Sequence, residues 1–150
     1  MEKILEKENK DPLLKGLKVI DAASFIAGPS AATIMSDYGA EVIKIEPESG
    51  DSLRNLISNG RMPEGPENYC WELTSRNKKS ISLNLKDQEA HKILINLVKE
   101  ADVFITNMPF PVRKKLNLKD LKEKLHFIKN LPNEIKKNKL KNCHTSNWTL

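Results

Sequence analysis

Four cationic side chains and one helix opening give this sequence the chemistry to bind a phosphorylated ligand. Gly28-Pro29 precedes an apolar pattern with helical spacing, and the first turn of a helix offers N–H groups to an anion. The cationic residues are Arg76, Lys78, Lys79 and Lys86. Both features also have a simpler interpretation, because Gly-Pro pairs commonly form turns and lysines at a strand entrance are commonly solvated. The residues themselves leave ligand binding and these simpler roles open.

The standard signatures of nucleotide binding and of hydrolysis are absent. The sequence contains no G-x-G-x-x-G, no G-x-x-x-x-G-K-[ST] and no G-x-S-x-G motif. Its two cysteines, Cys70 and Cys143, lie far apart, which argues against a disulfide framework and a zinc site and fits a reducing compartment. His126 and His144 stand in no catalytic motif, and such histidines are usually solvated. We therefore predict no metal site.

The composition is that of one ordinary globular domain. The chain has 150 residues, of which 39% are hydrophobic and 30% are charged, and these are enough apolar residues for a single core. No apolar run approaches the roughly 20 residues that a membrane-spanning helix needs. Residues 1–8 lack the apolar centre and the cleavage site of a secretory signal. We therefore expect a cytoplasmic protein.

The net charge of +5 is unevenly distributed. Residues 113–142 contain eleven Lys or Arg against three acidic residues, whereas the rest of the chain contains 14 basic and 17 acidic residues. This distribution argues against a protein that binds nucleic acid over its whole surface. The basic end could bind RNA or an anionic membrane, but it has neither an arginine cluster nor interleaved aromatic residues. We expect no specific nucleic-acid partner and no membrane partner.

The elements that position the cationic residues begin with a strand–helix–strand unit. Residues 17–21 form an apolar run that is typical of a buried strand. A helix is expected to open at Pro29 and to end at Gly39, and residues 41–46 form a second apolar run. The expected helix carries apolar side chains at Ala31, Ile34, Met35 and Tyr38. Such a unit makes parallel sheet.

Residues 47–106 are expected to form a long loop, a strand, a helix and a further strand. Residues 47–67 are rich in Gly, Pro, Asn and Ser, and residues 80–85 alternate between polar and apolar side chains as a half-buried strand does. Asp87 can cap a helix that is followed by a strand at 102–106. The helix has apolar residues at helical spacing, namely Ala90, Ile93, Leu94, Leu97, Val98 and Ala101.

These elements predict an α/β fold that is Rossmann-like, with a mostly parallel open sheet and flanking helices, incomplete at its C-terminal side. We divide the chain into a polar lead-in (1–11), an α/β part (12–121) and a Lys/Asn-rich tail (122–150), with one more helix expected around Leu121, Leu125 and Ile128. Ligands of open α/β sheets bind outside the carboxyl ends of the strands. The segments there are residues 23–29, 46–51, 83–86 and 107–115.

An ordered set of short motifs resembles the N-terminal part of the family III CoA-transferases, over about residues 11–121. That family also includes formyl-CoA transferase, carnitine CoA-transferase and the α-methylacyl-CoA racemases. The motifs are Asp11-Pro12-Leu13-Leu14-Lys15-Gly16-Leu17-Lys18-Val19-Ile20-Asp21, Ile26-Ala27-Gly28-Pro29, Tyr38-Gly39-Ala40-Glu41-Val42-Ile43-Lys44-Ile45-Glu46-Pro47, Ser49-Gly50-Asp51-Ser52-Leu53-Arg54, Arg76-Asn77-Lys78-Lys79-Ser80-Ile81-Ser82-Leu83-Asn84-Leu85-Lys86 and Ala101-Asp102-Val103-Phe104-Ile105-Thr106-Asn107. Each motif is weak alone, but their order makes the resemblance specific.

The resemblance implies that coenzyme A binds across this domain and that two subunits interlock as a homodimer. It places Ile26 and Ala27 beside the bound CoA and Pro47 at its adenosine end. It also implies nucleotide contacts by Leu83, Asn84, Leu85, Lys86, Asn107, Met108 and Pro109, and a basic residue at Lys115. Where the family usually has an aromatic residue and Pro-Gly after the asparagine, this chain has Met108-Pro109-Phe110-Pro111. We therefore expect a differently shaped nucleotide loop.

The family's transferases exchange CoA between an acyl-CoA and a carboxylic acid through an aspartate nucleophile, and covalent catalysis of this kind splits one hard exchange into easier steps. No aspartate of this sequence matches that nucleophile's motif, so we assign no catalytic residue. The chain resembles an N-terminal fragment without the nucleophile. An acyl-CoA racemase of the same family and a non-catalytic CoA-binding fragment are the alternatives.

Overall fold

The computed structural model describes residues 11–56, 59–61, 65–116 and 118. The predicted tail (122–150), the helix expected around Leu121, and the lead-in up to residue 10 lie outside the described residues. The described part contains a four-stranded parallel sheet with the strand order β3-β2-β1-β4. Its strands are β1 (Lys18–Asp21), β2 (Glu41–Glu46), β3 (Lys79–Ser82) and β4 (Val103–Ile105). The predicted α/β class and parallel sheet are confirmed.

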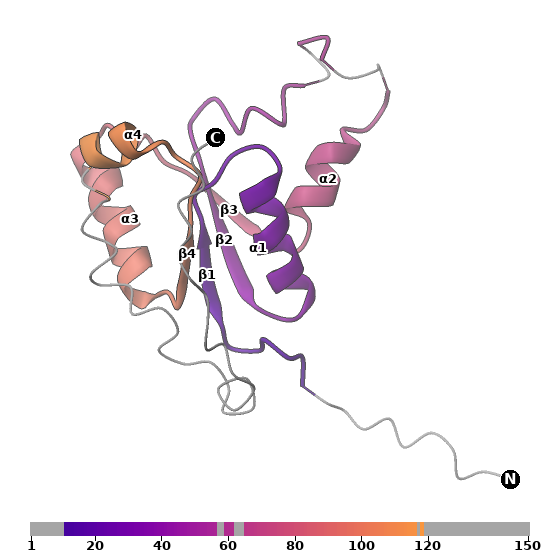
Figure 1. Cartoon of the computed structure of the whole chain (residues 1–150), viewed down its shortest axis with the longest axis horizontal. Coiled ribbons are helices and arrows are strands. Elements are labelled where there is room, and N and C mark those ends of the chain that lie inside the picture. Colours follow the sequence, from indigo (N-terminus) through magenta and orange to yellow (C-terminus); the bar gives the residue numbers. More distant parts are fainter. Residues whose placement is uncertain (1–10, 57–58, 62–64, 117, 119–150) are drawn as a thin grey trace, which may run out of the picture.

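Helices cover both faces of this sheet (Figure 1). They are α1 (Ala27–Asp37), α2 (Tyr69–Ser75), α3 (Gln88–Glu100) and α4 (Phe110–Lys115). The chain moves from β1 to β2 to β3 in one direction and then crosses back to β4. Because crossovers between parallel strands are right-handed, the first two connections lie on one face and the third lies on the other. Accordingly α1 and α2 lie on one side of the sheet, and α3 and α4 on the other (Figure 1).

Each face of the sheet packs its own apolar cluster. On the α1 side, Val19 of β1 and Val42 of β2 pack with Ala32 of α1. On the α3 side, Ile20 and Ile45 pack with Leu94 and Val98. Successive residues of a strand point to opposite faces, which is why neighbouring residues belong to different clusters.

The helix after β1 forms as predicted, but it turns a different face to the sheet. Gly39 ends it with a φ of +96°, and the bonds Gly39 N–H to Ser36 O and Ala40 N–H to Met35 O form a Schellman motif. The buried face consists of Pro29, Ala32, Thr33 and Ser36 rather than the larger apolar residues, so that Ile34 and Tyr38 are exposed. Small side chains let α1 approach the sheet and α2 closely, and the Thr33 hydroxyl donates to Thr74 O at 2.6 Å.

Two further elements were not predicted, and one boundary differs. Helices α2 and α4 have seven and six residues, too few for a periodic signal. The strand expected through Leu85 ends at Ser82, although residues 80–85 keep the predicted alternation of burial. Helix α3 is confirmed, including its cap, because the Asp87 carboxylate accepts the amides of Glu89 and Ala90.

Candidate functional site

The candidate site lies at the carboxyl edge of the sheet, where the segments following all four strands meet. Backbone bonds join these segments in pairs: Ala22 N–H donates to Ile105 O after β1 and β4, and Leu83 N–H donates to Glu46 O after β3 and β2, both at 2.8 Å. Strand β1 lies between β2 and β4. The chain therefore runs from the carboxyl end of β1 to β2 on one side and later returns to β4 on the other side of β1. Such a reversal point is where open α/β sheets bind their ligands.

Asn107 ties the two sides of this reversal point together. Its Nδ2 donates to Ser24 O at 2.8 Å, and its Oδ1 accepts the Ser24 N–H at 3.0 Å. A single side chain that follows β4 therefore occupies both backbone polar groups of a residue that follows β1. The family resemblance implies a nucleotide contact for Asn107, and the structure shows that its side chain clamps two loops together.

A buried cluster of charges underlies the loop between β1 and α1. Lys44 Nζ lies 3.0 Å from Asp51 Oδ2 and 3.9 Å from Asp21 Oδ2, and it donates to Ala23 O at 2.9 Å. Lys78 Nζ lies 2.9 Å from Asp21 Oδ2. All four charged side chains are at most 2% exposed. We call these four residues the buried charge cluster; its charges are paired, as burial requires.

Burial determines how the lysine below α1 titrates. Removal from water lowers the pKa of Lys78, while the neighbouring Asp21 carboxylate acts in the opposite direction by hydrogen bonding and by charge. Lys78 Nζ also donates to Pro29 O and Thr74 O, both at 2.7 Å, so its hydrogen-bonding groups are directed at protein acceptors. Lys78 therefore holds α1 and α2 to β1 and does not point toward a ligand.

A third carboxylate, Glu46, anchors the loop after β2. Arg54 donates to it twice, at 2.7 and 2.9 Å, and the Asp51 amide and the Ser80 hydroxyl donate as well. The Arg54 guanidinium lies over the Trp71 ring at 3.6 Å from the ring centroid. Residues 47–54, predicted to be part of a long loop, are thus held in a defined shape from both ends.

Glu46 is expected to make the protein sensitive to acid. Burial alone would raise the pKa of its carboxyl, but the hydrogen bonds from Arg54, Ser80 and the Asp51 amide outweigh burial and lower the pKa from 4.5 to about 2. The folded-state pKa is below the unfolded value, so the stabilisation is complete above about pH 4.5 and is lost as the pH falls toward about 2. Urea denaturation at pH 5, 4 and 3 measures this loss.

Glu46→Gln should flatten this pH dependence over the same range, because the variant has no proton to take up. Glu89→Gln is the matched control, since Glu89 is an exposed residue of α3 that pairs with the exposed Lys92. The control should follow the wild-type profile. A Glu46→Gln variant that loses stability as steeply as the wild type between pH 4.5 and 3 would contradict the assignment.

The N-terminus of α1 opens at the same edge. Its N-cap residue, Ile26, supplies no side-chain hydrogen bond, and Phe25, Ile26 and Ala27 are exposed. Gly28 permits a close approach here: a Cβ at this position would lie 2.4 Å from Ala23 Cβ. The first turn of α1 therefore packs tightly against the β1 loop while its end faces outward, the arrangement in which helix amides receive an anion.

The residues predicted from the family resemblance separate into two groups. Leu83 is buried, and Leu85 and Met108 are partly buried against the α3-side cluster, so their side chains belong to the core. The others are exposed, namely Ile26, Ala27, Pro47, Asn84, Lys86, Asn107, Pro109 and Lys115. Asn84 also shapes its turn, because its side chain accepts the Lys86 amide at 3.2 Å.

The four cationic residues predicted as a phosphate cluster do not come together. Arg76 forms a bidentate pair with Asp37 at the far end of α1, and Lys78 is buried. Lys79 pairs with Glu41 at the amino ends of β3 and β2. Lys86 alone of the four follows the carboxyl end of a strand and is exposed. Further cations stand in α4, where Arg113, Lys114 and Lys115 form the last turn.

The two prolines after Asn107 start a helix rather than an irregular loop. Pro109 is the N-cap of α4, and Pro111 lies in its first turn, where the missing N–H costs no hydrogen bond. The His91 ring nitrogen Nε2 lies 2.6 Å from Leu116 O and connects the end of α4 to α3. The segment after Asn107 is therefore a short helix that carries basic residues.

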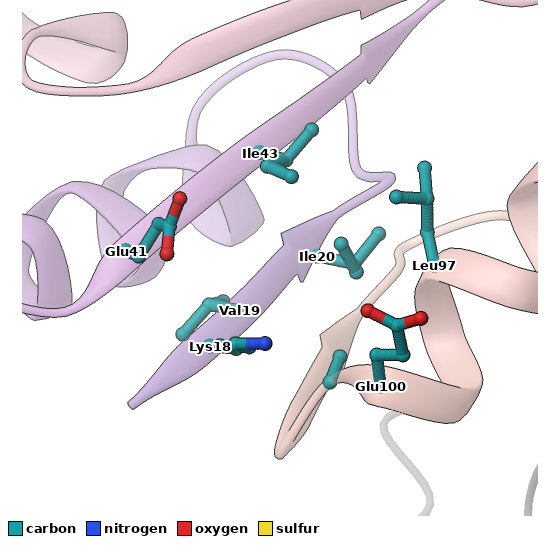
Figure 2. A pocket seen from close by; sticks show the side chains of 8 residues that line it. Lys18, Val19, Ile20, Glu41, Ile43, Leu97 and Glu100 are labelled. Atoms are coloured by element: carbon teal, nitrogen blue, oxygen red, sulfur yellow. The ribbon is translucent and has the colours of Figure 1, made fainter. Parts of the chain in front are cut away.

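The structure also has a hollow at the opposite edge, which is not the candidate site. It has a volume of about 190 Å³ and lies beside the amino ends of β1 and β2 (Figure 2). Ile20, Ile43 and Leu97 line it together with Lys18, Glu41 and Glu100. Ligands of parallel sheets bind at the other edge. Among the described residues, no helix is long and apolar enough to cross a membrane, and no three His, Cys, Asp or Glu residues gather as metal ligands.

Sequence reasoning missed the buried charge cluster and the Glu46–Arg54 pair. One signal was available: strands of a parallel sheet are covered on both faces, so a charged residue inside one must find a buried partner. Lys44 lies in the middle of β2 and Asp21 ends the apolar run of β1. These positions indicated a buried ion pair, but the sequence did not indicate which residues were partners.

The strand order, the reversal point beside β1 and the helices on both faces of the parallel sheet define a Rossmann-like α/β domain. Within this class the chain belongs to CoA-transferase family III, because the model of that family matches residues 14–126. The resemblance predicted from the motifs is confirmed.

Similar proteins agree with this assignment. The chain is 43% identical over 107 residues to (R)-2-hydroxy-4-methylpentanoate CoA-transferase of Clostridioides difficile, covering 71% of this chain and 27% of that protein. It is 44% identical over 120 residues to cinnamoyl-CoA:phenyllactate CoA-transferase of Clostridium sporogenes, covering 78% and 29%. A crystal structure of a CaiB/BaiF family protein from Brucella suis superposes with a TM-score of 0.66 at 31% identity, covering 77% and 31%. The chain thus spans less than a third of these proteins.

Proposed function

We propose that this chain forms the coenzyme A-binding part of an enzyme that transfers CoA between an acyl-CoA and a carboxylic acid. The observation that carries the proposal is the gathering of four strand-end segments around the exposed N-terminus of α1 in a chain of this family. The simpler alternative is an α/β domain whose loops only connect its elements. It would leave the exposed Phe25 and Ile26 at this edge without a role.

In the proposed complex, backbone amides of Ala27 and Gly28 face the pyrophosphate of CoA, because a helix N-terminus attracts anions. Lys86 and Lys115 supply positive charge near the phosphates. Pro47 and Asn84 line the nucleotide, with Asn107 and Pro109 beside them. Leu83, Leu85 and Met108 contribute through their backbone and by supporting the turns, since their side chains pack in the core.

The transfer itself needs a nucleophile, and the family resemblance implies an aspartate that forms a covalent intermediate with CoA. No aspartate among the 150 residues stands in the matching motif, so the proposed role of these residues is binding, not covalent chemistry. The relatives from Clostridioides difficile and Clostridium sporogenes are both CoA-transferases, which supports transfer over racemisation. We further propose a cytoplasmic location and an interlocked homodimer for the whole protein.

Binding of coenzyme A by the 150-residue chain is the direct test, measured by isothermal titration calorimetry. Lys86→Ala should weaken CoA binding about fivefold, since one unit charge near a solvated phosphate contributes about 1 kcal/mol. Lys99→Ala is the matched control, because Lys99 is an exposed lysine in the last turn of α3.

The control should bind CoA as the wild type does. Absence of CoA binding by the wild-type chain would contradict the proposed function. Equal weakening by Lys86→Ala and Lys99→Ala would show that the contribution is overall charge and would contradict the placement of the phosphates at the β3 turn.

A further inference from the structure

Phe25 has a backbone conformation that phenylalanine rarely adopts. Its φ is 63°, in the left-handed region, and Asn77 is the other non-glycine residue with positive φ in the described part of the chain. Asparagine tolerates this region, whereas for a bulky residue it is a clear outlier. Phe25 as a whole residue is also 45% exposed, so burial does not compensate for the strain.

The strain is imposed by side chains from three other segments. The backbone of Ala23 is held by Asp21, which accepts its N–H, and by Lys44, which donates to its oxygen. Asn107 holds both polar groups of Ser24. The Phe25 N–H then donates to Asp51 Oδ1 at 3.4 Å. The buried charge cluster and the Asn107 clamp thus fix this loop residue by residue and leave Phe25 with little conformational freedom.

The fixed conformation presents an apolar surface at the candidate site. Phe25 precedes α1 by two residues, and its neighbour Ile26 is 55% exposed. Both side chains lie in the segment that leaves β1 at the reversal point of the sheet. Persistent strain of this kind is concentrated at ligand-binding positions, where the surrounding structure over-determines it.

We propose that Phe25 contacts the ligand and that its ring stacks on a planar ring of a CoA thioester. Two parts of such a ligand have this chemistry, namely the adenine and an aromatic acyl group. The inference rests on the proposed function and adds a residue that determines ligand preference. Stacking between planar rings is favourable. The hydrogen bonds to the backbone of residues 23–25 fix the position from which the Phe25 ring extends.

The test compares binding of three ligands by isothermal titration calorimetry: adenosine 3′,5′-bisphosphate, acetyl-CoA and cinnamoyl-CoA. Phe25→Asn removes the ring and keeps a residue that tolerates positive φ. Tyr38→Asn is the matched control, because Tyr38 is an exposed aromatic residue at the other end of α1. Phe25→Asn should weaken binding about tenfold for each ligand whose ring is stacked, and Tyr38→Asn should change nothing.

The ligands distinguish the two rings. Weakening of all three ligands assigns the contact to adenine, and weakening of cinnamoyl-CoA alone assigns it to the acyl group. Unchanged binding of all three ligands overturns the inference while the proposed function stands. Weaker binding of the two thioesters alone also overturns it, because that result would place the contact on the pantetheine arm. If the wild-type chain binds none of them, the proposed function fails and this inference fails with it. Phe25→Gly, which also adopts positive φ, replaces Phe25→Asn if a thermal melt shows that the latter does not fold.

Discussion

Lys44→Met should lower the free energy of unfolding by about 3 to 5 kcal/mol, the usual cost of breaking a buried ion pair from one side. The substitution keeps an unbranched side chain that is one atom shorter, and it removes the ammonium that pairs with Asp51 at 3.0 Å and donates to Ala23 O. Asp21 retains Lys78, but Asp51 is left as a buried carboxylate without its cation. Urea denaturation at pH 7 measures the loss.

Two further variants make this result specific to burial. Lys79→Met breaks an exposed ion pair of similar geometry, in which Lys79 Nζ lies 2.6 Å from Glu41 Oε1. Ion pairs on the exposed surface contribute about 1 kcal/mol or less. Lys44→Met combined with Asp51→Asn removes both charges and keeps an acceptor for the Leu53 amide, so it should recover part of the stability. If Lys44→Met and Lys79→Met cost the same, the buried charge cluster does not stabilise the fold through its burial.

Gly28→Ala should destabilise the fold by about 1 to 3 kcal/mol, the usual cost of adding a methyl group to a packed interior. The new Cβ would lie 2.4 Å from Ala23 Cβ and 3.4 Å from Ile105 Cγ2. Because Ala23 is fixed by Asp21 and Lys44, it cannot move away without breaking these bonds. Thermal or urea denaturation measures the change.

Removing the methyl group of Ala23 should restore part of the stability of this variant. Ala23→Gly combined with Gly28→Ala relieves the contact, so the two substitutions together should cost less than the sum of their separate effects. Gly65→Ala is the control, since a Cβ at Gly65 meets nothing within 4 Å. Strict additivity of the first pair, or an equal cost at Gly65, would contradict the packing of α1 against the β1 loop.

Both predictions concern the loop that the proposed function uses. The buried charge cluster forms hydrogen bonds to the backbone of Ala23 and Phe25, and Gly28 allows this loop to lie close to α1. A variant that loosens either feature is therefore expected to affect CoA binding as well as stability. Stability should be measured first, so that a loss of binding in a folded variant can be attributed to the position of the loop.

Most of the local structure follows from short-range patterns in the amino-acid sequence. The unit of residues 17–46, the capped helix after Asp87 and the alternation over residues 80–85 depend on spacing, caps and turn residues that act within a few positions. The gathering of the strand-end segments also followed from the sequence, because parallel strands connected by helices bring their carboxyl ends to one edge. The family resemblance then indicated which ligand this edge would bind.

The availability of charged side chains to a ligand depends on tertiary packing. Lys78 and Lys79 are neighbours in sequence, yet one is buried against Asp21 and the other is paired with Glu41 at the opposite edge. Asp21 and Lys78 are 57 positions apart, and no local pattern encodes such a partner. The buried face of α1 and the strained Phe25 have the same origin, because both result from groups that distant segments bring into contact. Local propensity fixes the elements, whereas the pairing of buried charges depends on how those elements are packed.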